Sequence, residues 1–107
     1  MDRITQRTWA RLVAGGCAAW VALAFGRTER MAGVIGTTPS EIRALGIRDA
    51  GSGLLLWFAR DPRLPLATRV AFDVSDAARY GRGRPRVLAM TLGFAAVGAA
   101  GLFLPRR

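Results

Sequence analysis

Apolar residues along this chain fall in blocks, and the two longest blocks lie near its two ends. The first covers residues 9–25 and is interrupted only by Arg11. The last covers residues 87–104 and contains no charged residue. A run of about 18 or more apolar residues is long enough to cross the hydrocarbon core of a bilayer as a helix. Both blocks therefore predict membrane-spanning helices.

A second helix is predicted over residues 39–59, although it carries charges. It follows the segment Thr38-Pro39-Ser40-Glu41. Thr38 is placed to cap the helix, proline suits the first helical position, and Glu41 occupies the third, which is the pattern of a capping box.

A third helix is predicted over residues 65–80, because its polar residues recur at i, i+4, i+7 and i+11 and so share one face. These residues are Arg69, Asp73, Asp76 and Tyr80. The sequence as a whole predicts an all-α fold, a small transmembrane bundle of four helices in one domain covering residues 1–107. Residues 26–37 are expected to be a polar connection whose apolar part, residues 31–35, lies along the membrane interface.

Charges in the two middle helices raise the question of whether the chain has two spans or four. A charged side chain at the bilayer centre costs about 2.5–3.5 kcal/mol on insertion scales. The middle helices could lie on the surface as an amphipathic hairpin, or cross with their charges turned inward. If the hairpin turns at Pro62, Arg48 and Asp76 are each fourteen residues from the turn. Because the rise per residue is equal, they would lie at the same depth, and we favour four spans.

The inward charges are the only candidate site, and two interpretations stay open. The cluster consists of Arg48, Asp49, Arg69, Asp73 and Asp76, whose charges sum to −1, and Arg79 is placed to neutralise it. One interpretation is a proton or ion path, or a polar substrate pocket, in which the last two aspartates titrate. The other, which we favour, is a buried salt-bridge network that holds the helices in register.

Small residues follow faces of the first, second and fourth predicted helices and would let other helices approach closely. The seams in the last two include Gly46, Ala50, Gly53, Gly93 and Gly101. They exceed the needs of one four-helix bundle, so some are expected to face a partner. We therefore expect a non-enzymatic integral membrane protein, either a self-associating bundle or an accessory subunit of a membrane complex. The alternative is a small transporter or ion conduit.

The charge of the chain points to lipid rather than nucleic acid. All sixteen basic residues are arginine, and the formal net charge is +9. The arginines bracket the apolar blocks, where they would contact anionic headgroups. Arginine without lysine also suggests a GC-rich bacterial genome, which predicts a multi-pass protein of the bacterial inner membrane. Arginine counts leave its orientation open. An alternative for residues 9–25 is a removed leader with a cleavage-like site at Ala22-Leu23-Ala24, but we expect an uncleaved span.

Residue types give little support for enzymatic or metal chemistry. The chain has no histidine, and its one cysteine, Cys17, lies in an apolar run where it is expected to be a packing residue. Asp73 and Asp76 could supply two oxygen ligands to a metal, but a full set needs several more. We expect no catalytic residues, no metal and no cofactor.

One short motif carries a family resemblance. The segment Ala44-Leu45-Gly46-Ile47-Arg48-Asp49-Ala50-Gly51, with Asp73 and Asp76 on the next helix, resembles a family of small bacterial four-helix membrane proteins of unknown function. The resemblance covers about residues 9–104. It implies the helical membrane fold and carries no activity with it.

Overall fold

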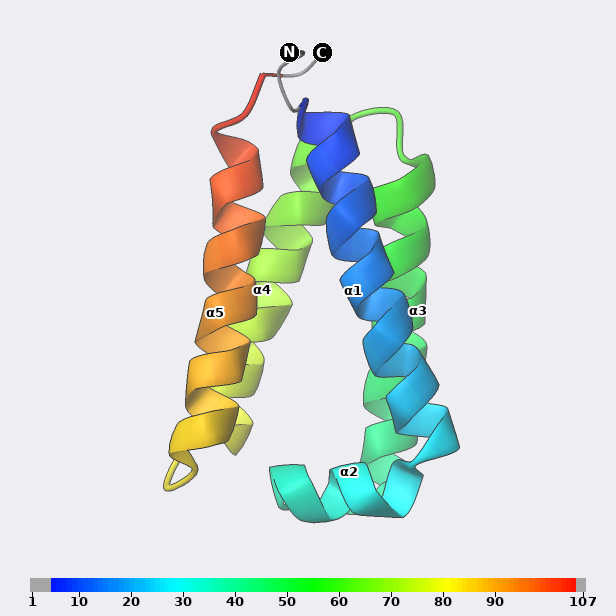
Figure 1. Cartoon of the computed structure of the whole chain (residues 1–107), viewed down its shortest axis with the longest axis vertical. Helices are drawn as coiled ribbons and strands as arrows, with labels where there is room; N and C mark the ends of the chain where they lie inside the picture. Colours follow the sequence, from blue (N-terminus) through cyan, green and yellow to red (C-terminus); the bar gives the residue numbers. More distant parts are fainter. Residues whose placement is uncertain (1–4, 106–107) are drawn as a thin grey trace.

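The structure, a computed structural model, describes residues 5–105 and contains five α-helices in that range. Their bounds are Gln6–Gly26 for α1, Thr28–Ile35 for α2, Pro39–Phe58 for α3, Arg63–Tyr80 for α4 and Pro85–Leu102 for α5. The four long helices run along the 42 Å axis of the molecule, and the short α2 crosses one end of them (Figure 1). The all-α prediction is confirmed, but the described residues form five helices and not four.

The helix that the sequence prediction missed is α2, which fills most of the expected connection at residues 26–37. Glu29 in its first turn suits the positive end of a helix dipole. Gly36 ends the helix with a φ of 83°, a left-handed conformation that favours glycine. Ala32 and Ile35 are buried in the apolar cluster at this end of the molecule. Eight residues are too few to form a stable helix alone, so this packing decides the conformation.

The expected capping box at the start of α3 is present only in part. The side chain of Thr38 accepts a hydrogen bond from the N–H of Glu41 at 3.2 Å, and Pro39 occupies the first position. In a full capping box the glutamate would return to the backbone N–H of the threonine. Instead its carboxylate accepts from the hydroxyl of Thr37 at 2.7 Å and from the hydroxyl of Tyr80. Glu41 therefore joins the start of α3 to the end of α4.

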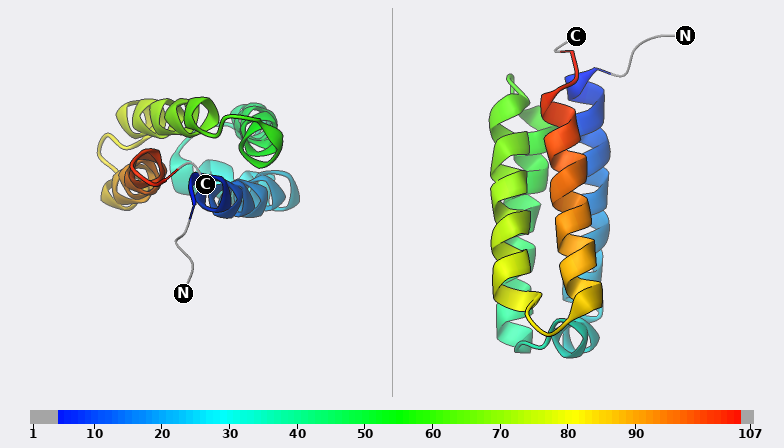
Figure 2. Two further views of the ribbon diagram at one scale, coloured as in Figure 1. Left: turned by 90° about the horizontal axis from the view of Figure 1, so that it is seen from above. Right: turned by 90° about the vertical axis from the view of Figure 1, so that its left-hand side faces the viewer.

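The four long helices form two closely packed pairs, α1 with α3 and α4 with α5 (Figure 2). The α3 and α4 backbones approach each other closely at few positions, although a short turn at residues 59–62 joins them. The two helices of the predicted charged hairpin, α3 and α4, therefore follow each other in the chain, but each packs more closely against another helix. Side chains span the wider separation between the pairs.

Small residues allow the close approach of α1 and α3. A Cβ atom added at Gly46 would lie 2.9 Å from the ring of Phe25, and one at Gly53 would lie 3.3 Å from Cβ of Cys17. Ala50, between them on the predicted seam, is half-buried. A larger side chain at either glycine would require the neighbouring side chains or the helices to shift.

The predicted seam of α5 divides into a packed part and an open part. A Cβ at Gly98 would lie 3.0 Å from a methyl group of Val70, and Gly101 is packed against the indole of Trp9. Gly93, in contrast, has no atom within 4 Å of the position that a Cβ would take. One end of α5 therefore packs inside the molecule while the middle of its seam is unoccupied.

Charged residues are buried between two apolar clusters. One cluster lies at the α2 end and contains Ile35, Ile42 and Val87, and the other lies at the α3–α4 turn and contains Leu56 and Leu66. Between them along α3 and α4, the buried polar residues are Asp49, Ser52, Arg69 and Asp73. The core therefore has a polar middle layer.

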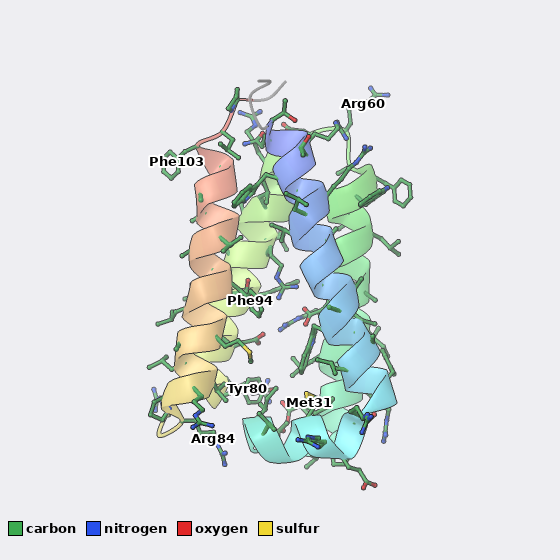
Figure 3. The ribbon with its side chains drawn as sticks, in the orientation of Figure 1. Met31, Arg60, Tyr80, Arg84, Phe94 and Phe103 are labelled. Carbon is green, nitrogen blue, oxygen red and sulfur yellow. The ribbon has the colours of Figure 1, made fainter. Side chains whose placement is uncertain are left out.

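Large apolar side chains, in contrast, cover much of the outer surface. Ile47, Phe58, Leu64 and Phe103 are 66–89% exposed. Figure 3 shows Phe103 pointing away from the bundle, whereas Tyr80 points into the space between the helix pairs. Within residues 5–105, α1 and α5 are the two helices long and apolar enough to cross a membrane by their own composition.

Candidate functional site

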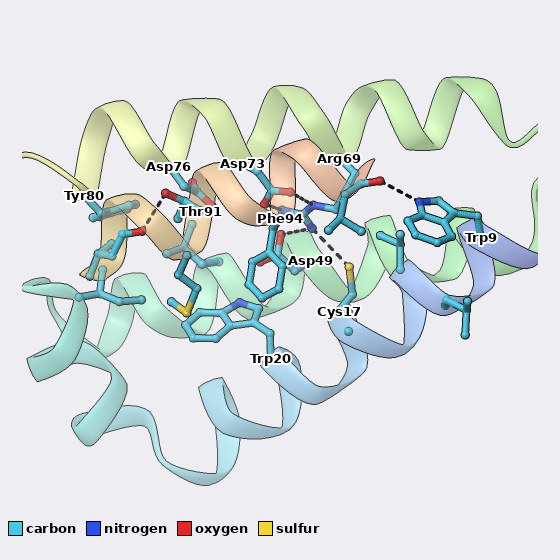
Figure 4. A pocket seen from close by; sticks show the side chains of 18 residues that line it. Trp9, Cys17, Trp20, Asp49, Arg69, Asp73, Asp76, Tyr80, Thr91 and Phe94 are labelled. Atoms are coloured by element: carbon cyan, nitrogen blue, oxygen red, sulfur yellow. Dashed lines mark hydrogen bonds and ion pairs between the residues drawn. The ribbon is translucent and has the colours of Figure 1, made fainter. Parts of the chain in front are cut away.

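Five charged side chains from α3 and α4 form one connected ion network, part of which is drawn in Figure 4. They alternate in sign along the network in the order Asp76, Arg48, Asp49, Arg69 and Asp73. These are the five residues of the cluster predicted from the sequence, and the structure brings all of them together.

The two arginines hold the three carboxylates through paired hydrogen bonds. Arg48 donates to both oxygens of Asp76, at 3.0 and 2.8 Å, and its Nε donates to Oδ1 of Asp49 at 3.0 Å. Arg69 donates to the same Oδ1 at 2.9 Å, and its Nε and Nη2 donate to the two oxygens of Asp73 at 3.3 and 3.0 Å. Such two-point contacts fix the orientation of each carboxylate as well as its distance.

Helix geometry explains how the local sequence produces this arrangement. On α4, Arg69 and Asp73 are one turn apart and pair along the helix. On α3, Arg48 and Asp49 are adjacent in sequence, so their side chains leave the helix in directions about 100° apart around its axis. Asp49 is therefore buried, while Arg48 lies over the ring of Phe72 at 4.5 Å and reaches across to α4. The contact that equal depth predicts for Arg48 and Asp76 is present.

Burial differs between the two halves of the network. Arg69, Asp49 and Asp73 are each no more than 5% exposed. The side chains of Arg48 and Asp76 are 26% and 15% exposed, so their pair lies at the edge of the layer. Charges as buried as the first three are tolerated only when paired and hydrogen-bonded.

The prediction that Arg79 neutralises the remaining charge of the cluster is wrong. Its guanidinium pairs with Glu41 at 2.6 Å, and its side chain is 67% exposed. The register of α4 places Arg79 one residue before Tyr80, on the side of the helix that faces the start of α3. The five-residue network therefore keeps its net charge of −1.

A cleft of about 300 Å³ lies beside the network, bounded mainly by α1 and α5 (Figure 4). Its polar side is formed by Asp49, Arg69, Asp73 and Asp76. The remaining lining is predominantly apolar and includes the rings of Trp20 and Phe94. The ion network is therefore at the same time the inner wall of an open, mostly apolar cleft.

Sequence reasoning missed the residues that α1 and α5 contribute to this site. Cys17 was expected only to pack, yet its sulfur accepts a hydrogen bond from Arg69 at 3.6 Å. Trp20, Phe94 and Thr91 line the cleft and were not predicted. Apolar residues surround both helices on nearly all sides, so no periodicity marks the face that turns toward the network.

The network leaves little room for the metal or acid–base chemistry that paired aspartates can perform. Both oxygens of Asp73 and both of Asp76 accept hydrogen bonds from arginine. Within residues 5–105, no three histidine, cysteine, aspartate or glutamate side chains form a metal-binding group. That the protein is not an enzyme stays a prediction.

In comparisons with known proteins, no family model, curated protein or solved structure matches this chain. The family resemblance of the motif around Arg48 therefore stays a prediction.

Proposed function

We propose that this chain is a four-span integral membrane protein without a catalytic role, which acts as a self-associating bundle or as a subunit of a larger membrane assembly. The distribution of polarity carries this proposal. The ion network lies inside, while side chains such as Ile47, Leu54 and Phe58 on α3 are more than 60% exposed. In water this arrangement would expose apolar surface and bury charge, and both cost free energy. In lipid the apolar surface contacts hydrocarbon, and the charges are kept away from it inside the bundle.

Helix lengths support two further spans in addition to α1 and α5. The twenty residues of α3 correspond to about 30 Å and the eighteen of α4 to about 27 Å. The hydrocarbon core of a bilayer is about 30 Å thick. The charges of both helices face each other, so four spans would not place them in lipid. The bacterial inner membrane remains the location that the composition predicts.

Arginines at both ends of α4 also support the placement of this helix across the bilayer. Arg60 and Arg63 lie in or next to the α3–α4 turn, and Arg82 and Arg84 lie in the α4–α5 turn. These turns are at opposite ends of the long axis (Figure 1). Arginines at helix ends reach the headgroup region with their charged groups.

Single-cysteine labelling distinguishes four spans from two. In a Cys17→Ala background, Arg60→Cys and Arg82→Cys would each be tested in sealed vesicles with a membrane-impermeant maleimide. Four spans require the two cysteines to label from opposite sides. Labelling of both from one side would place α3 and α4 on the surface and contradict the proposal.

Self-association is supported by the open part of the α5 seam. Gly93, Ala96 and Ala100 are exposed and lie at three- and four-residue spacing. Small residues at this spacing let two membrane helices approach closely. We expect crosslinking in native membranes to give a species larger than one chain, and Gly93→Leu to reduce it. Single-chain behaviour of the unaltered protein would exclude a self-associated or subunit role.

A transporter or ion conduit is the second candidate, because the cleft reaches the carboxylates of Asp73 and Asp76. Asp73→Asn and Asp76→Asn, reconstituted in liposomes, test it. Lost flux with intact folding would support transport, and loss of folded protein alone would support a structural network.

A further inference from the structure

The cleft has the size and composition of a ligand site. Its volume of about 300 Å³ is at the lower end of the range for small-molecule pockets. A predominantly apolar lining with a few polar groups on one side is also typical of such pockets. In Figure 4 the rings of Trp20 and Phe94 lie beside the ion network, so the apolar wall and the charged wall meet.

The charged groups that line the cleft are mostly negative. They are three aspartates, Asp49, Asp73 and Asp76, and one arginine, Arg69. Arg48, which balances part of this charge, does not line the cleft. The lining therefore carries a formal charge of −2, although the whole network carries −1.

One carboxylate in this wall meets its arginine partners through a single oxygen. Oδ1 of Asp49 accepts hydrogen bonds from both Arg48 and Arg69, and the bonds from these two arginines leave Oδ2 aside. Asp49 is only 4% exposed and lines the cleft. A carboxylate in a mostly apolar wall favours a cation or a donor group close by.

Aromatic rings strengthen the preference for a cation. Trp9, Trp20, Tyr80 and Phe94 all line the cleft. The faces of such rings attract organic cations, quaternary ammonium groups above all. An anionic headgroup, in contrast, would meet three aspartates and a guanidinium already committed to Asp49 and Asp73.

We propose that the cleft between α1 and α5 binds a hydrophobic organic cation, with its charge beside the aspartates and its apolar body against Trp20 and Phe94. This goes beyond the proposed membrane role and rests on it only for the route, which is entry from the bilayer between α1 and α5. Binding itself requires no second copy of the chain and no transport.

Two ions of the same shape and opposite charge test the proposal. The full chain in nonionic detergent would be titrated calorimetrically with tetraphenylphosphonium and with tetraphenylborate, and empty micelles would serve as the blank. We expect the phosphonium to bind at one site per chain, at least about tenfold more tightly than the borate. Equal affinities, tighter binding of the borate, or no binding of either ion would overturn the proposal.

A variant of the cleft wall locates the site without disturbing the ion network. Trp20→Leu removes one ring and should weaken phosphonium binding about three- to thirtyfold. The matched control is Trp57→Leu, since Trp57 is 44% exposed and does not line this cleft. Circular dichroism would verify that both variants fold. Unchanged binding by Trp20→Leu, or an equal loss in both variants, would place the ion elsewhere and overturn the proposal. The labelling of Arg60→Cys and Arg82→Cys tests the membrane role separately.

Discussion

The contacts within the two helix pairs and the contacts between the pairs differ in their physical basis. Within a pair, glycines such as Gly53 and Gly98 let backbones approach until side-chain atoms of the neighbouring helix are in contact. Between the pairs, α3 and α4 are bridged by Arg48 and Arg69, whose long side chains reach carboxylates on both helices.

The difference shows that close packing of the helices and a defined register between them are separate requirements in this molecule. Small-residue packing brings the backbones of a pair together through van der Waals contact. The ion network adds a stricter requirement, because a shift of either helix would leave buried charges unpaired. We infer that the network sets the register of the pairs and that the space it leaves is the cleft.

The largest effect is expected from removing the most buried cation. Arg69→Ala leaves Asp49 and Asp73 without their shared partner, and breaking such a buried pair costs about 3–5 kcal/mol. The free energy of unfolding, measured by denaturant titration in detergent, should fall by this amount. Arg63→Ala is the control, since the side chain of Arg63 is 53% exposed. A loss no larger in Arg69→Ala than in Arg63→Ala would show that the network does not hold the pairs together.

A smaller effect is expected from disturbing the packing of one helix. Gly101→Leu would force the leucine into the indole of Trp9, and overpacking typically costs about 1–3 kcal/mol. At Gly93 on the same helix a Cβ would have no atom within 4 Å, so Gly93→Leu should leave the free energy of unfolding of the single chain unchanged or raise it. An equal loss in the free energy of unfolding of the two variants would contradict the division of the α5 seam into a packed part and an open part.

The smallest effect is expected in the α3–α4 turn, outside both kinds of interface. The N–H of Arg63 donates to Asp61 at 3.1 Å and, with the guanidinium of Arg63, lowers the pKa of that carboxyl. A lowered pKa stabilises the fold above the ordinary pKa of aspartate and loses that contribution as pH falls through the lowered value. Because the pair is exposed, Asp61→Asn should change the thermal midpoint little at pH 7 and less still at pH 3. A large shift at pH 7 would mean that this turn, too, organises the bundle.

Much of the fold could be predicted from the sequence because its helices carry strong local signals. Each of the four long helices begins and ends within three residues of its expected bounds. Thr38 and Pro39 mark the start of α3, and the spacing from Arg69 to Asp76 marks the polar face of α4. Only α2 was missed, since a short segment depends on the burial of Ile35 more than on its own propensity.

The sequence by itself determined which charges share a helix face and lie at equal depth, because the rise and period of an α-helix are fixed. Tertiary structure alone decided that α1 pairs with α3 and α4 with α5, that Arg79 turns to Glu41, and that Cys17, Trp20 and Phe94 reach the network. The physical reason is that an apolar helix such as α5 offers almost equivalent faces to its neighbours. Which face turns inward is settled only when all the helices pack together.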